Sequence, residues 1–417
     1  MRKLFIPRNN EVSISVCVPC SFCIFPLRGI YAGILALALC LGVCLSGTVD
    51  VYAQLGVPGT QETTAKGEKL ASDLEDTLTA LIAAVPTGKS LPAEAELIKL
   101  ARFMMSPDLD PGEIRVAKRE HGEGVLMRQV FRSSFAKLAR YCFDPRIPSE
   151  ILYPMVLRRG NWLPDSQFVQ ESVQLWNRLD TPEMLVLRGT EYEEITPDSF
   201  SGCYYNYTLG RLVVLLHVDG KPVLFSISRQ NAPSSVGRKA AIVGRDDNWN
   251  YIYTKVVGSN LKLVGWAETY MYDSVTVSLT YPSDEGSALA FFKWVRAGWS
   301  NLNMVKSKHI RSGGERFLAS MRQVLDAQNL PKPEAIYARY NELAAMDDAA
   351  LHAAFEPHSV ALANSARGDS LLSSPDFQSV LKDGAYTRQL GREELISELM
   401  KLYMKERLGM RDLALTP

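Results

Sequence analysis

The chain has 417 residues, of which 47% are hydrophobic and 22% are charged. Its 46 basic and 46 acidic residues leave a net charge of 0, which argues against a nucleic-acid-binding protein, because such proteins carry a basic excess. The length suffices for one large domain or two smaller ones.

The first 53 residues have the pattern of an export leader. Arg28 precedes 19 residues without charge, from Gly29 to Gly47, and Ala53 ends a small-x-small cleavage sequence. We predict a signal peptide over 1–53, with the true start after the first 26 residues, and a periplasmic or secreted protein. The alternative is an uncleaved leader that anchors the chain in the inner membrane, because 19 apolar residues can span a bilayer.

Five of the seven cysteines lie in this leader. Three of them have the spacing C-x-x-C-x-x-C, but an apolar run follows instead of a folded frame, so we expect no metal ion and no cofactor. Cys142 and Cys203 remain in the body of the chain. An even pair in an oxidising compartment predicts a disulfide, and two buried free thiols are the alternative.

A polar arm over 54–65 is followed by a segment that we predict to be helical, 66–182. Leucines recur there at steps of three and four residues, as in one face of a helix, and prolines and glycines separate the repeats. The expected helices cover 65–85, 93–105, 126–141 and 166–179.

The pattern changes to strands between 184 and 281. "RLVVLLHVDGKPVLFSIS" predicts a hairpin that turns at Asp219-Gly220, and "DSVTVSLTY" alternates apolar and polar residues, as a half-buried strand does. We expect six to eight strands. No helix of useful length lies among them, so the sheet is antiparallel.

Helical spacing returns in "SALAFFKWVRAGWSNLN". The stripe of Ala288, Phe292, Val295, Trp299 and Leu302 predicts a long apolar helix over 286–304. This helix completes a domain over 183–312. A helical segment over 313–417 follows, with helices near 315–328, 333–346, 347–364 and 392–408.

This order of elements predicts an α+β fold in which a long apolar helix packs on a central antiparallel sheet. Residues 184–305 resemble the helix-grip domains, which close a curved antiparallel sheet over a long C-terminal helix and often hold apolar ligands. The resemblance is one of architecture and rests on no sequence motif. A plain α+β sandwich explains the same order.

Aromatic residues crowd the predicted sheet and helix. Such side chains combine an apolar face with a polar tip and suit a ligand pocket, although a tyrosine-rich core has the same composition. We expect a ligand between the sheet at 184–281 and the helix at 286–304. The residues predicted to line its pocket are Tyr205, Tyr253, Trp266, Tyr270, Trp294 and Trp299.

The stretch "SRQNAPSSVGRKAAIVG" collects hydroxyls, cations and a glycine. Backbone N–H groups beside Arg and Lys can bind an anion, whereas the spacing of a nucleotide-binding P-loop is absent. The alternative is an ordinary solvated connection. The predicted anion-binding residues are Arg229, Ser234, Ser235, Arg238 and Lys239.

We therefore predict a non-enzymatic exported protein that binds an apolar, aromatic or anionic small molecule or an envelope protein. Nucleic acid is not expected as a partner, and a membrane only through an uncleaved leader. One alternative is an envelope hydrolase that acts on glycan or ester through Glu268, Asp273 and Ser235. Another is a structural partner in an envelope complex that docks through its C-terminal helices, which an exposed apolar stripe on 392–408 would favour.

Overall fold

The computed structural model describes residues 67–198, 201–261, 265–367, 369–382 and 384–410. The predicted leader and arm lie outside these residues. Among the described helices, none has both the length and the apolar character that a membrane span requires.

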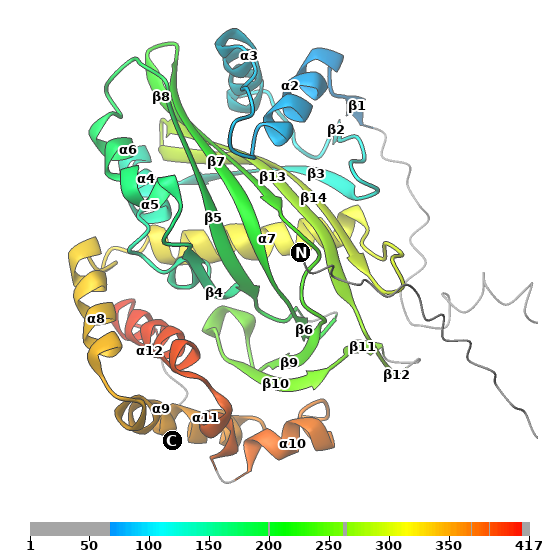
Figure 1. Ribbon diagram of the computed structural model, residues 1–417, viewed down its shortest axis with the longest axis vertical. Coiled ribbons are helices and arrows are strands. Elements are labelled where there is room, and N and C mark those ends of the chain that lie inside the picture. Colours follow the sequence, from blue (N-terminus) through cyan, green and yellow to red (C-terminus); the bar gives the residue numbers. More distant parts are fainter. Residues whose placement is uncertain (1–66, 199–200, 262–264, 368, 383, 411–417) are drawn as a thin grey trace, which may run out of the picture. The chain divides into compact units, whose positions relative to one another are not determined.

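A seven-stranded sheet whose neighbouring strands are all antiparallel organises the fold (Figure 1). The sheet's first strand in the sequence, β3, pairs with its last strand in the sequence, β14, although more than 150 residues separate them along the chain. In spatial order the strands are β3 (Glu123–Phe131), β14 (Gly286–Gly298), β13 (Tyr270–Ser283), β8 (Lys221–Gln230), β7 (Asn206–Val218), β5 (Leu185–Ile195) and β4 (Leu157–Trp162).

The hairpin of β7 and β8 confirms the turn expected from the sequence. Val218 pairs with Lys221, and both turn residues have positive φ, 51° at Asp219 and 78° at Gly220. A two-residue turn of this kind matches the twist of the two strands that it joins.

The prediction of a long apolar helix over 286–304 is wrong, because these residues form strand β14 and the loop after it. Both faces of β14 are covered by protein, so its sequence is apolar nearly throughout and lacks a clear period of two. The positions that made a helical stripe therefore fall on both faces of a strand: Phe292 packs on one side, whereas Val295 borders the other.

The prediction that the segment 66–182 is all helical is wrong, because this segment supplies two strands of the seven-stranded sheet, β3 and β4. Residues expected to form a helix at 126–141 divide between β3 and a shorter helix, α4 (Phe135–Phe143). The other predicted helices are present: α2 (Ser72–Ala83), α3 (Glu94–Met105), and α5 (Gln167–Glu171) with α6 (Val173–Asn177).

The sheet has a different cover on each face. Helices α2 and α3 bury their leucines against one face, together with Val275, Val277 and Leu279 of β13. Helix α7 (Ser307–Leu325) crosses the other face (Figure 1). A curled antiparallel sheet with a long helix across it is the architecture expected, but the helix is α7, and the arrangement begins with β3 rather than at residue 184.

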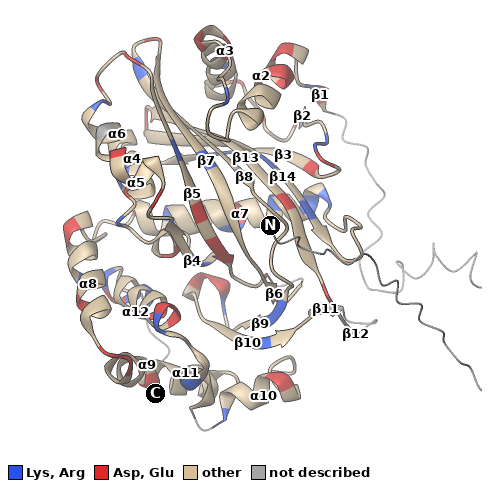
Figure 2. Ribbon diagram, viewed as in Figure 1, with Lys and Arg blue, Asp and Glu red and all other residues tan. Residues whose placement is uncertain are grey.

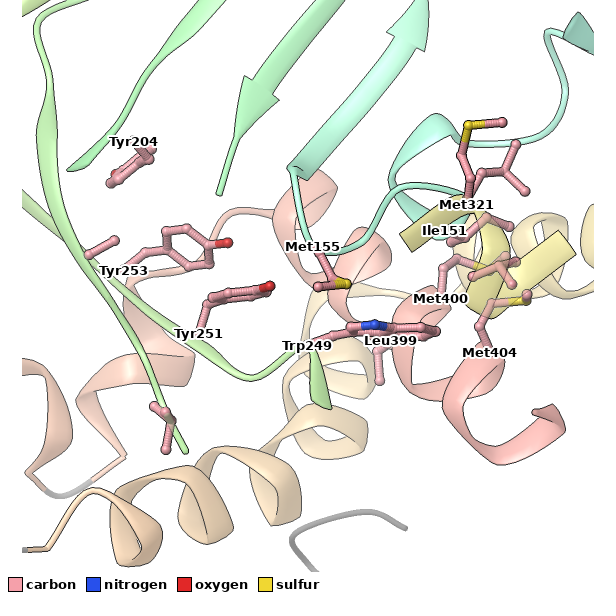
Figure 3. Close-up of a cluster of buried hydrophobic side chains, with 14 of the residues drawn as sticks. Ile151, Met155, Tyr204, Trp249, Tyr251, Tyr253, Met321, Leu399, Met400 and Met404 are labelled. Atoms are coloured by element: carbon pink, nitrogen blue, oxygen red, sulfur yellow. The ribbon is translucent and has the colours of Figure 1, made fainter. Parts of the chain in front are cut away.

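The C-terminal region is helical, as predicted. Its stripe on α12 (Arg392–Arg407) is buried within the chain: Leu399, Met400 and Met404 pack beside Trp249 and Tyr251 (Figure 3). The exposed stripe that would favour docking through this helix is therefore absent from the described part of α12. The other helices are α8 (Pro333–Ala345), α9 (Asp348–Ser365), α10 (Pro375–Leu381) and α11 (Ala385–Gln389).

Smaller elements complete the described chain. A three-stranded sheet lies beside the C-terminal helices, with β10 (Tyr251–Val257), β9 (Arg238–Ile242) and β6 (Cys203–Tyr204) in that order. The remaining elements are β1 (Glu68–Lys69), β2 (Ile114–Arg115), β11 (Ser259–Leu261), β12 (Gly265–Ala267), and the 3₁₀ turns η1 (Ser149–Ile151) and η2 (Asp246–Asn248).

Candidate binding cavity

A cavity of about 500 Å³ lies between the seven-stranded sheet and α7. Strands β4, β5, β7, β8, β13 and β14 of this sheet contribute to its wall, together with Cys203 of β6, and α7 closes it from the other side with residues from His309 to Met321. The size falls within the range of small-molecule sites in proteins.

Hydroxyl side chains cover the part of the wall formed by β8 and β13. Two cross-strand pairs place them in register, Ser226 opposite Ser278 and Ser228 opposite Thr276. The alternating strand predicted from "DSVTVSLTY" is therefore confirmed, and its polar face borders the cavity. The hydroxyl residues in this wall are Ser226, Ser228, Ser274, Thr276, Ser278 and Thr280.

A β-bulge in β13 extends this wall. Met271 pairs with Ala297 and Asp273 with Arg296, so Tyr272 is an extra residue between them. An extra residue reverses the alternation of faces along a strand. Met271 and Ser274 consequently both border the cavity although they are three residues apart.

Two carboxylates and an arginine form a charged cluster in the wall. Arg211 on β7 donates from Nε to Glu191 on β5 at 2.5 Å and from Nη1 to Ser226 Oγ at 3.0 Å. Its Nη2 lies 3.8 Å from Glu193 Oε1. Burial raises the pKa of Glu191 to about 7, and Arg211 opposes this shift. Figure 2 shows the acidic stretch of β5 that carries both glutamates.

Lys293 on β14 supplies a second cation to the cavity. Its Nζ donates to Ser274 Oγ at 2.7 Å and to Thr276 Oγ1 at 2.9 Å. Among the described residues, no carboxylate forms an ion pair with it. Burial lowers the pKa of Lys293 to about 8, because an ammonium ion loses its hydration inside the protein.

Apolar side chains line the rest of the cavity. Phe317 of α7 meets the ring of Phe291 edge-on, with 5.9 Å between ring centroids, and lies 4.9 Å from the ring of Tyr153. An apolar lining with a few convergent polar groups is typical of sites that bind small organic molecules. The apolar residues include Leu138, Phe143, Leu289, Phe291, Phe317 and Met321.

Both cysteines of the described chain border the cavity, but no disulfide joins them. Cys203 Sγ donates to Gly258 O at 2.9 Å. Cys142 lies on α4 beside Tyr153, and burial raises the pKa of its thiol to about 11. The predicted disulfide between these two cysteines is therefore not formed.

Two of the six predicted aromatic residues border the cavity. The hydroxyl of Tyr205 is hydrogen-bonded to Thr269 Oγ1 at 2.7 Å, and Trp299 follows the end of β14. Both residues border the cavity between the sheet and α7, which takes the place of the predicted helix.

The other aromatic residues lie elsewhere. Trp294 faces the opposite side of the sheet, where it stacks on Phe292 and donates from Nε1 to Ala117 O at 2.8 Å. Tyr253 belongs to the buried cluster beside the C-terminal helices (Figure 3). Tyr270 stacks on Tyr272 at the end of β13. The side chain of Trp266 lies outside the described part of the chain.

The predicted anion-binding residues do not form one concave site. Ser234 and Ser235 both join neighbouring strands, since their Oγ atoms accept hydrogen bonds from Met271 N at 2.9 Å and Asn206 N at 3.1 Å. Lys239 pairs with Asp376 of α10, Arg229 lies 4.0 Å from Glu120, and Arg238 belongs to β9.

The residues of the alternative hydrolase are also not gathered. Glu268 is exposed and accepts a hydrogen bond from the hydroxyl of Tyr270 at 3.3 Å. Asp273 is half-buried on β13 and accepts from Ser274 N at 3.0 Å. In the described structure no contact joins either carboxylate to the other or to Ser235.

Comparisons with known proteins add little to this description. No family model and no curated protein matches the sequence. A crystal structure of protein CV1439 from Chromobacterium violaceum matches 49% of this chain and 97% of its own, with 11% identity and a TM-score of 0.16. A TM-score so low carries no structural argument, so the site rests on the geometry described above.

Proposed function

We propose that this chain is a non-enzymatic binding protein that holds a small amphipathic molecule between its sheet and α7. The observation that carries the proposal is the mixed lining of one cavity of about 500 Å³. Aromatic and aliphatic side chains form one part of it, and hydroxyls with the charged side chains of Arg211, Lys293, Glu191 and Glu193 form another. A molecule with an apolar body and a polar end matches both parts. We further propose that the protein acts after export, on the pattern of residues 27–53.

Binding is favoured over catalysis because the polar groups of the wall are engaged with one another. Arg211 is held by Glu191 and Ser226, and Lys293 by two hydroxyls. Ser278 Oγ donates to Ser226 O at 2.9 Å. Such mutual hydrogen bonds keep polar side chains in fixed positions, which suits recognition of one orientation of a ligand.

Fluorescence of N-phenyl-1-naphthylamine, a neutral apolar dye, tests the proposal. We expect saturable binding to the purified protein. Ser278→Leu adds apolar volume to the middle of the cavity wall and should abolish it. Ser365→Leu makes the same chemical change at an exposed position of α9 and should leave it intact. Equal binding by both variants, or none by the unmodified protein, would contradict the proposal.

A further inference from the structure

Lys293 stands out in its strand because its neighbours are apolar. Phe291 and Val295, two residues before and after it, share its face of β14 and also border the cavity. A lysine among apolar residues in a wall is costly unless its ammonium group has partners. Ser274 and Thr276 accept two of its three hydrogens.

The charges around Lys293 do not neutralise it by contact. Glu193 on β5 and Asp273 on β13 attract the ammonium from a distance, and Arg211 on β7 repels it. Two of the cavity's carboxylates are already engaged, because Glu191 pairs with Arg211 and Glu193 lies 3.8 Å from the same guanidinium. Lys293 therefore has a donor left and no anionic partner among the described residues.

We propose that Lys293 binds the carboxylate of a monoanionic amphiphile whose apolar part lies against Phe291 and Phe317. This proposal rests on the proposed function and narrows its ligand class. A charge-assisted hydrogen bond from Nζ, with Ser274 and Thr276 beside it, would fix the head group. A phosphate dianion fits less well, because Glu191 and Glu193 share the same wall and would repel a second negative charge.

Calorimetric titration with decanoate, decanol and decylamine tests the proposal, since the three probes share a tail and differ in the charge of the head. We expect the unmodified protein to bind decanoate about tenfold or more tighter than decanol, and decylamine weakest. Lys293→Met keeps an unbranched side chain without the charge. It should lose the preference for decanoate and retain the affinity for decanol, which also shows that the variant is folded.

A control variant and the opposing results complete the test. Lys255→Met removes a charge from an exposed position of β10 and should change none of the three affinities. If Lys293→Met fails to fold, Lys293→Gln takes its place. Equal affinity of the unmodified protein for decanoate and decanol would overturn the carboxylate proposal and leave the binding function standing. Tighter binding of decylamine would overturn it in favour of a cation site, and no binding of any probe would contradict the binding function as well.

Discussion

The Nζ atom of Lys293 donates a hydrogen bond to Thr276 Oγ1 at 2.9 Å across the neighbouring strands β14 and β13. Thr276 belongs to the polar face of β13, whose sequence alternates between apolar and polar residues. Lys293 interrupts the largely apolar sequence of β14. Their contact brings these two irregularities of the sequence together in the wall of one cavity.

The contact predicts how the stability of the protein depends on pH. The pKa of Lys293 is about 8 in the folded chain, against an ordinary value of 10.5. Between these pH values the unfolded chain binds more protons at this position, so the free energy of unfolding should rise with pH. We expect the unmodified protein to gain up to about 3 kcal/mol relative to Lys293→Met over this range.

Urea unfolding of both proteins at several pH values between 8 and 10.5 measures this difference. Tyrosines and other lysines titrate in both proteins and cancel in the comparison. The charged groups that act on Lys293 are Glu193, Arg211 and Asp273, and all three remain in the variant. A difference that stays constant with pH, or falls, would show that the ammonium is not held in a desolvated site.

Two adjacent glycines in α7 predict opposite effects of alanine. A Cβ at Gly313 would meet no atom within 4 Å, whereas one at Gly314 would clash with Met127 Sδ on β3. Gly313→Ala should stabilise the protein by about 0.5–1 kcal/mol, because alanine favours a helix. Gly314→Ala should gain nothing or cost about 1 kcal/mol, because Met127 must shift. Urea midpoints compare the two, and a more stable Gly314→Ala variant would refute the close packing of α7 on β3.

The reactivity of the two cysteines can show whether a ligand occupies the cavity. Cys142 and Cys203 both border the cavity and are not disulfide-bonded. We expect iodoacetamide to modify both thiols more slowly when decanoate is bound. The fractional decrease in the modification rate should be about equal to the fraction of sites that are occupied. Peptide mass spectrometry of each cysteine measures the two rates separately. Decanol at a saturating concentration serves as the neutral control, and rates that are unaffected by any occupant would place the ligand outside this cavity.

Local patterns predicted the elements that depend on local geometry. The Asp219-Gly220 turn and the alternation over 273–281 identified two parts of the sheet correctly, because both are set by neighbouring residues. The run over 286–304 predicts a helix, whereas it forms β14 and the loop after it. A strand covered on both faces keeps no period of two, and its apolar residues happened to match a helical spacing.

The charged part of the cavity could not be predicted from spacing alone. Glu191, Arg211 and Lys293 lie on three strands, and only the order of strands in the sheet brings them to one wall. A signal was nevertheless present, since Lys293 and Arg211 are single cations within apolar runs. The polar face of β13 was seen in the sequence, but its position over a cavity depends on α7, which follows β14.

Native mass spectrometry of the purified protein, before and after denaturing extraction, tests the central claim most directly. We predict a reproducible bound mass of a small organic molecule that is lost on denaturation. Trp299→Ala removes one aromatic side chain from the cavity lining and should weaken the retention of this molecule. Trp294→Ala changes the opposite face of the sheet, so the folded fraction of this variant should still hold the molecule. A mass equal to that of the bare chain, both as purified and after incubation with decanoate, would contradict the account.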